Sequence, residues 1–255
     1  MNKPFFIAEI GINHNGSIDL AKQLIDMAVE CGCDAVKFQK RTVEKCYTQE
    51  FLDQPRESPW GTTQREQKHG LEFSPWQYAK IDAYCKSRNI PWFASAWDID
   101  SQIFLRQYDL KYNKIASRMI ANVELLVRVA EEKKFTFIST GIDKKYYIDV
   151  AVDIFKTAGC PFMLMHCIPL YPCPDEKDAF ESLNTLKELY NVPVGYSCHN
   201  PNRLSPVVGV LEGAEAIEVH ITLDRLMYGT DQKASSEREE LAEIVRNCRL
   251  VRAAI

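Results

Sequence analysis

Short apolar segments alternate with amphipathic segments along most of the sequence, and this alternation restricts the fold more than any other feature. The apolar segments have the length of buried strands, and the amphipathic ones repeat apolar residues at helical spacing. About eight such pairs fit a (β/α)8 barrel, and the chain has 255 residues. We therefore predict the α/β class, with one TIM-barrel domain over residues 1–255. The predicted strands are Phe5–Ile10, Ala35–Gln39, Trp92–Ser95, Lys114–Ala116, Phe135–Ser139, Phe162–His166, Pro193–Tyr196 and Ala216–His220.

Helices are predicted between and after these strands. A doubly wound sheet is the alternative fold, but no glycine-rich G-x-G-x-x-G turn follows the first strand. One polar segment, Lys45–Ser74, interrupts the alternation after the second strand. We expect a long loop there, either a lid over the mouth of the barrel or a surface excursion. The predicted helices are Asp19–Glu30, Trp76–Arg88, Asp100–Tyr108, Asn122–Glu132, Tyr147–Thr157, Ala179–Leu189, Pro206–Leu211 and Glu237–Ala254.

Composition narrows the class of protein. The formal net charge of -4 argues against a nucleic-acid-binding surface, which needs a basic face. The nine cysteines are scattered and no secretory leader precedes them, which indicates reduced thiols rather than a disulfide framework. No apolar run approaches the roughly 20 residues that span a bilayer. We expect a soluble cytoplasmic protein without a nucleic-acid or membrane partner.

Polar residues stand where the predicted strands end, and barrel enzymes place their catalytic groups there. Two of them, Lys37 and Lys114, are lysines within apolar strands, and a buried lysine is costly unless it is paired. We expect them to bind an anionic substrate together with hydroxyls and amides near Ser139–Gly141. The alternative is a set of internal salt bridges, for example between Glu9 and Lys37. The strand-end residues are Glu9, Lys37, Gln39, Ser95, Lys114, Ser117, Ser139, His166, Tyr171, His199 and His220.

The last two predicted strands are each followed or ended by a histidine. His199 and His220 would supply half of a divalent metal site, with water or substrate oxygens as the remaining ligands. Glu218 shares a strand face with His220, and Asp231 closes the next loop. The alternative is a pair of hydrogen-bonded histidines without a metal. A metal beside a carbonyl stabilises the alkoxide that forms under attack by carbon, so the residues indicate an aldol-like condensation or its reverse.

Seven motifs, in this order along nearly the whole chain, resemble the sialic acid synthase (N-acetylneuraminate synthase) family. Members condense phosphoenolpyruvate (PEP) with an N-acylmannosamine, a related amino sugar or its phosphate. The products are a nine-carbon, sialic-acid-like (nonulosonic) 2-keto acid and phosphate. The motifs are IAEIGINHNG at 7–16, AVKFQ at 35–39, NKIAS at 113–117, ISTG at 138–141, HCIPLYPCP at 166–174, GYSCH at 195–199 and EVHITLDRLMYGTD at 218–231.

The resemblance implies a role for each matching position. His199 and His220 would bind Mn²⁺ or Mg²⁺ as neutral imidazoles. Glu9 and Asp231 would be catalytic, with Glu9 handling the water or proton at the enol ether and Asp231 contacting the acceptor sugar. The remaining positions would bind substrate: Lys37, Lys114, Ser117 and Ser139 hold PEP, and Gln39, Ser95 and Tyr171 make nearby polar contacts.

Three departures from the family pattern stand out. Met119 replaces a sugar-binding glutamate, and Pro169 replaces an asparagine that touches the PEP phosphate. Typical members also carry a C-terminal antifreeze-like domain, which we expect to be absent here; Arg118 would then supply a replacement cation to the acceptor. The resemblance implies a homodimer or a separate antifreeze-like partner.

Three alternatives remain open. One is a PEP-dependent synthase with another aldehyde acceptor, as in the octulosonate and heptulosonate synthases. A second is a degenerate barrel that binds a sugar phosphate and needs a partner domain. A third, unsupported by any CxxC spacing, is a zinc site that includes Cys167 or Cys198 beside the histidines.

Overall fold

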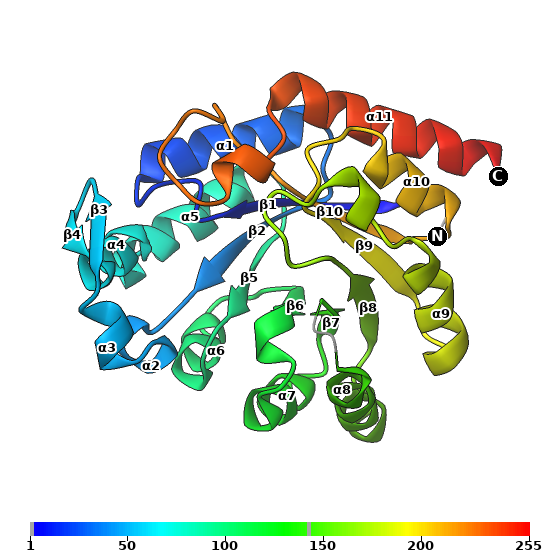
Figure 1. Ribbon diagram of the computed structural model, residues 1–255, viewed down its shortest axis with the longest axis horizontal. Coiled ribbons are helices and arrows are strands. Elements are labelled where there is room, and N and C mark those ends of the chain that lie inside the picture. Colours follow the sequence, from blue (N-terminus) through cyan, green and yellow to red (C-terminus); the bar gives the residue numbers. More distant parts are fainter. Residues whose placement is uncertain (1–2, 142–143) are drawn as a thin grey trace.

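A closed barrel of parallel strands forms the centre of the molecule (Figure 1). The computed structural model describes residues 3–141 and 144–255. Within them the strands follow the order β1-β10-β9-β8-β7-β6-β5-β2, which confirms the predicted (β/α)8 TIM barrel. The barrel strands are β1 (Phe5–Gly11), β2 (Ala35–Lys40), β5 (Trp92–Ala96), β6 (Tyr112–Ile115), β7 (Phe135–Ser139), β8 (Phe162–His166), β9 (Val194–Cys198) and β10 (Ala216–His220).

Helices surround the barrel, one after each of these strands, as Figure 1 shows. Local sequence explains where they begin: at α5, for example, Ser74 and Gln77 form a capping box and Pro75 occupies the first turn. No helix among the described residues is long and apolar enough to cross a membrane. The surrounding helices are α1 (Ile18–Glu30), α5 (Pro75–Ser87), α6 (Ile99–Leu105), α7 (Val123–Ala130), α8 (Lys145–Ala158), α9 (Glu181–Tyr190), α10 (Ser205–Leu211) and α11 (Arg238–Ala254). Short 3₁₀ helices are η1 (Ser117–Met119), η2 (Asp175–Lys177) and η3 (Gln232–Ala234).

The barrel interior has an apolar floor and a polar upper layer. Since side chains alternate between the faces of a strand, residues two positions apart both point inward. The buried floor contains Ile7, Ala35, Phe93, Phe137, Met163, Met165 and Ala216. The polar layer at the carboxyl ends of the strands contains Glu9, Lys37, Ser95, Lys114, Ser139, Ser197 and Glu218, all of them buried. The larger apolar core lies between the strands and the surrounding helices, where residues such as Phe6, Leu24 and Leu241 pack. The polar layer is therefore held between this core and the apolar floor.

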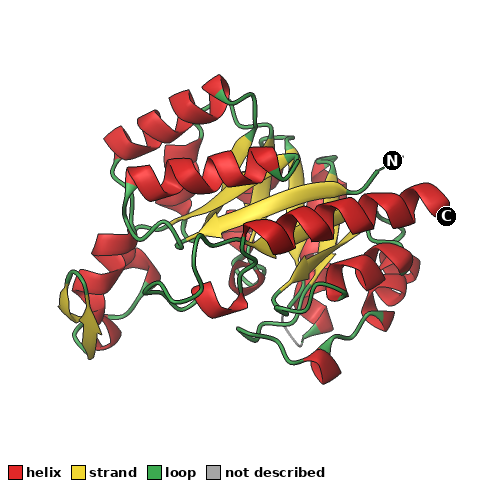
Figure 2. Cartoon of the chain, turned by 90° about the horizontal axis from the view of Figure 1, so that it is seen from above, coloured by secondary structure: helices red, strands yellow, loops and turns green. Residues whose placement is uncertain are grey.

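The segment after β2 is a folded excursion rather than the predicted polar loop. It comprises α2 (Val43–Cys46), α3 (Gln49–Leu52), the hairpin of β3 (Pro55–Ser58) and β4 (Gly61–Thr63), and α4 (Gln64–Leu71). Figure 2 shows it projecting from one side of the barrel. The Trp60 ring lies edge-on to Tyr228, 5.7 Å between centroids, and packs so closely on Gly70 that a Cβ there would lie 2.1 Å from Trp60 Cγ. The Gly70 contact joins the hairpin turn to α4, and the Tyr228 contact attaches the excursion to the loop after β10.

Candidate active site

One cavity of about 750 Å³ opens at the carboxyl ends of the strands, and all but one of the residues predicted for the site line it. Strand register explains the convergence, because Glu9 pairs with both Lys37 and His220, and Ser95 pairs with both Gln39 and Lys114. The predicted residues found in the wall are Glu9, Lys37, Gln39, Ser95, Lys114, Ser117, Arg118, Ser139, Tyr171, His199, His220 and Asp231.

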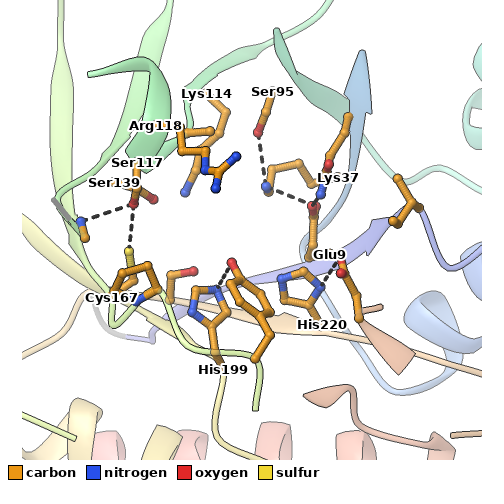
Figure 3. A pocket seen from close by; sticks show the side chains of 18 of the residues that line it. Glu9, Lys37, Ser95, Lys114, Ser117, Arg118, Ser139, Cys167, His199 and His220 are labelled. Carbon is orange, nitrogen blue, oxygen red and sulfur yellow. Dashed lines mark hydrogen bonds and ion pairs between the residues drawn. The ribbon is translucent and has the colours of Figure 1, made fainter. Parts of the chain in front are cut away.

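Two lysines and two carboxylates form an ion-pair network at the base of the cavity, and Figure 3 shows the Lys37–Glu9 pair. Lys37 Nζ lies 3.0 Å from Glu9 Oε2 and 3.4 Å from Glu218 Oε1, and Lys114 Nζ lies 3.0 Å from Glu218 Oε2. Ser197 donates a hydrogen bond to the same Glu218 carboxylate at 3.0 Å. The internal salt bridges considered as an alternative for the lysines are therefore present. Glu218 and Ser197 were missing from the predicted site, although each shares strand parity with a predicted histidine.

The network shifts the pKa values of its members in different directions. Burial raises the pKa of Glu9, although Lys37 opposes the change. For Glu218, the two lysines outweigh burial and lower the pKa. Burial lowers the pKa of Lys114, whereas Glu218 and Glu9 overcome burial at Lys37 and raise its pKa. Glu218 is thus the permanent counterion, and Glu9 is the carboxyl group suited to exchange a proton.

Glu9 is held in place by its neighbours. Gln39 donates a hydrogen bond to Glu9 Oε1 at 3.0 Å. A Cβ at Gly11 would lie 3.1 Å from the same oxygen, and Gly11 has φ 55°, so glycine suits this position on both counts. The carboxylate is therefore fixed at the point where β1 ends.

A group of hydroxyl, amide and thiol donors lies on the wall formed after β6 and β7. The Gly141 N–H donates to Ser117 Oγ at 3.1 Å, and Cys167 Sγ lies 3.1 Å from the same hydroxyl. A Cβ at Gly141 would lie 2.8 Å from both atoms, so a side chain there would close the space. Ser139 is buried beside them. Burial raises the pKa of Cys167, which keeps it a thiol and a donor.

His199 and His220 lie on the opposite wall (Figure 3), and the Tyr171 ring contacts both imidazoles. His199 Nδ1 lies 2.6 Å from the Ile168 carbonyl oxygen, so this nitrogen carries the proton and Nε2 keeps its lone pair. The Tyr171 hydroxyl lies 2.8 Å from that Nε2. Burial, with His220 nearby, lowers the pKa of His199 to about 3, so the imidazole is neutral. His220 Nδ1 is buried without a hydrogen-bond partner and lies 3.8 Å from Asp231 Oδ2.

These donors fit two positions of a divalent metal site. A neutral imidazole with an available lone pair is a metal ligand, and its other nitrogen is oriented by a carbonyl in the way that such ligands are. The centroids of the two imidazole rings are 5.4 Å apart. Across residues 3–141 and 144–255, no group of three or more His, Cys, Asp or Glu side chains could hold a metal ion. Further ligands would have to be oxygens of water or substrate, and the zinc site with cysteine is not formed.

Other polar residues from the motifs have structural positions. His166 is buried outside the cavity wall and stacks on Tyr196 at 6.1 Å, so the expectation that it serves the site is wrong: its parity on β8 points it toward the helices. Met119 packs against the apolar core, and Pro169 lines the cavity without a side-chain donor.

Three further wall residues, Arg41, Lys68 and Trp97, had not been predicted for the site. Arg41 follows the Lys37 and Gln39 parity of β2 and could have been found from that pattern. Lys68 lies on α4 of the excursion, where the sequence carries no signal for it.

The sequence matches the NeuB family over residues 24–255. The chain is 36% identical to N-acetylneuraminate-9-phosphate synthase of Homo sapiens over 254 residues, which are 98% of this chain and 71% of that protein. It is 31% identical to N,N'-diacetyllegionaminic acid synthase of Campylobacter jejuni over 261 residues, covering 100% of this chain and 78% of the other.

A solved structure gives the same result. The N-acetylneuraminic acid synthetase of Leptospira borgpetersenii, crystallised with citrate, superposes with a TM-score of 0.90 at 31% identity over 99% of this chain and 85% of that one. Sequence and fold agree along nearly the whole length, which confirms the family predicted from the motifs. The chain belongs to the NeuB family.

Proposed function

We propose that this protein joins PEP to the aldehyde carbon of an amino-sugar aldose of the N-acylmannosamine type and releases a nonulosonic 2-keto acid and phosphate. The names of the relatives support a synthase of this class. The observation that carries the proposal is one cavity that brings His199 and His220 together with the buried Glu9, Lys37, Lys114 and Glu218. Such a cavity offers one wall for an anion and another for an aldehyde oxygen.

The reaction balances with water as the third reactant. The methylene carbon of PEP attacks the aldehyde carbon, which forms the new C–C bond and an alcohol. Water adds to the resulting oxocarbenium carbon. The C–O bond to phosphate then breaks, which leaves the 2-keto acid and inorganic phosphate.

The chain's own residues would divide these tasks. Lys114 Nζ makes its ion pair with Glu218 and keeps other N–H donors for the anionic substrate. Ser117 and Ser139 would orient the phosphate from their wall. Glu9, whose pKa is raised by burial, would take the proton of the added water. Enclosure of these groups strengthens each electrostatic contact.

A divalent ion, Mn²⁺ or Mg²⁺, held by His199 and His220 would polarise the aldehyde oxygen when bound. Asp231 lies beside His220 and would receive a hydroxyl of the acceptor sugar. The Tyr171 ring lies tilted against His199, 4.0 Å between centroids, and would keep that imidazole aligned.

The direct test measures phosphate release from PEP with Mn²⁺ and a panel of aldoses that includes N-acetylmannosamine. We expect release with at least one aldose, and a loss of at least about 100-fold in His220→Ala, because removing even an outer-sphere partner of a metal ligand costs about 10- to 100-fold. His69→Ala is the matched control, because His69 is an exposed histidine on α4 outside the cavity wall. Unchanged release in His220→Ala would remove the proposed role of that histidine. Failure to bind PEP at all would favour the degenerate barrel.

A further inference from the structure

The outer part of the cavity carries positive charge that the inner network does not balance. Within the described part of the chain, the inner lysines meet Glu9 and Glu218, which leaves Asp231 as the other carboxylate in the wall. Three more cations line the same cavity, and we call them the outer cationic cluster: Arg41, Lys68 and Arg118. They come from three separate elements, the end of β2, helix α4 and η1. An excess of cations in a cavity is a site for an anion.

Arg41 is buried and held in a fixed orientation. Its guanidinium carbon lies 4.3 Å from the centre of the Trp97 ring, and Glu72 pairs with it at 3.3 Å. Glu72 also pairs with Lys40, so one carboxylate serves two cations. Arg41 Nε and Trp97 Nε1 are buried N–H donors without a hydrogen-bond partner among the described residues. Two neighbouring donors left unsatisfied beside a cavity indicate a ligand that accepts hydrogen bonds.

Lys68 also indicates an anion site, because its charge is not paired. Its ammonium lies 5.5 Å from the Tyr47 ring centre and makes no ion pair with any described carboxylate. Burial, with Arg41 and other cations nearby, lowers the pKa of Lys68 to about 8. Only Asp231 opposes that change. This ammonium therefore lacks a counterion among the residues that the structure describes.

Arg118 completes the cluster at the mouth. It is exposed, makes no ion pair within the described residues and lies across the cavity from His199 and His220 (Figure 3). An acceptor whose aldehyde is held at the histidines would therefore extend its far end toward the cluster.

We propose that the outer cationic cluster binds a phosphate monoester at the end of the acceptor sugar away from the aldehyde, so that the enzyme prefers a phosphorylated acceptor. The inference rests on the proposed condensation. A phosphate offers several acceptor oxygens to the Arg41 and Trp97 donors and supplies the counterion for Lys68. Since PEP adds three carbons to a six-carbon acceptor, a phosphate on the acceptor's sixth carbon would become a phosphate on the ninth carbon of the product.

The test compares kcat/KM for N-acetylmannosamine and for N-acetylmannosamine 6-phosphate in the wild type and in Lys68→Met. We expect the wild type to favour the phosphorylated acceptor. In Lys68→Met the ratio of the two kcat/KM values should fall about 10- to 100-fold, the range for one charged hydrogen bond. Lys68→Arg retains the charge and should retain most of the preference. Lys80→Met is the matched control, because Lys80 is an exposed lysine on α5 outside the cavity wall.

The outcomes separate this inference from the proposed function. Equal use of both acceptors by the wild type, or an unchanged ratio in Lys68→Met, overturns the phosphate site while the condensation stands. If neither acceptor releases phosphate from PEP, calorimetry with N-acetylmannosamine 6-phosphate decides the inference without turnover. Binding that weakens at least about tenfold in Lys68→Met supports the site, and no binding to the folded wild type refutes it.

Discussion

At the scale of single residues, Glu218 is the shared counterion of the two buried lysines. It pairs with both buried lysines and accepts the Ser197 hydrogen bond, so its charge makes the polar layer tolerable. In Glu218→Gln, Lys37 and Lys114 lose their shared counterion. We expect the free energy of unfolding to fall by about 3–5 kcal/mol, the usual cost of breaking a buried ion pair. Urea unfolding at neutral pH measures it.

Ser197→Ala is the control for that change, since it removes a neutral hydrogen bond to the same carboxylate. We expect it to cost about 1 kcal/mol. If Glu218→Gln unfolds with the same midpoint as Ser197→Ala, the network does not depend on the charge of Glu218, and Glu9 alone balances the lysines.

At the scale of elements, the excursion after β2 is a folded segment that forms part of the cavity wall, rather than an unattached loop over the mouth of the barrel. Trp60 packs on Gly70 and Tyr228, so the hairpin β3–β4 depends on one indole ring. We expect Trp60→Ala to speed hydrogen exchange of the hairpin amides at least about tenfold while the barrel strands keep their protection, since local opening needs only about 1.4 kcal/mol less for that factor. Trp76→Ala, an exposed tryptophan on α5, is the control. Uniform exchange across the molecule would contradict this local anchoring.

The same elements show how much of the fold can be predicted from the sequence. Period-two strands and amphipathic helices predict the barrel to within about two residues at most boundaries, because burial of one face imposes the pattern. The folded excursion after β2 could not be predicted in this way. Its four-residue helices are too short to show a period and depend on tertiary contacts such as Trp60. Lys68 lies on the eight-residue α4, and it could not be assigned to the cavity because the position of that helix beside the barrel depends on tertiary contacts. Arg41 could have been, since Lys37, Gln39 and Arg41 continue one alternation past the end of β2.

At the scale of the whole molecule, the barrel interior has two layers. Apolar side chains fill the lower layer, and the polar residues proposed for chemistry lie above them. Burial lowers the pKa of the imidazoles of both His199 in the cavity and His14 outside it. His14 lies in the turn after β1, where its Nδ1 accepts the Gly16 N–H at 3.0 Å and its ring stacks on Phe73 at 3.9 Å. It is therefore part of the turn and does not line the cavity. Burial, with Arg41 nearby, lowers the pKa of His14 to about 3.

This shift fixes the direction of an acid effect on stability. The unfolded chain protonates His14 near its ordinary pKa of 6.5, whereas the folded protein does not do so until about pH 3. Between these values the unfolded state binds the extra proton, so stability falls as pH falls, by about 2 kcal/mol at pH 5 from this group. His14→Asn keeps an acceptor for Gly16 but cannot be protonated. It should cost about 1 kcal/mol or more at pH 7 through the lost ring stack, and its deficit against the wild type should shrink or reverse by pH 5. Urea unfolding of both proteins at the two pH values measures this, with His69→Asn as the reference for removing an exposed imidazole; a constant deficit would mean that His14 becomes charged in the folded barrel.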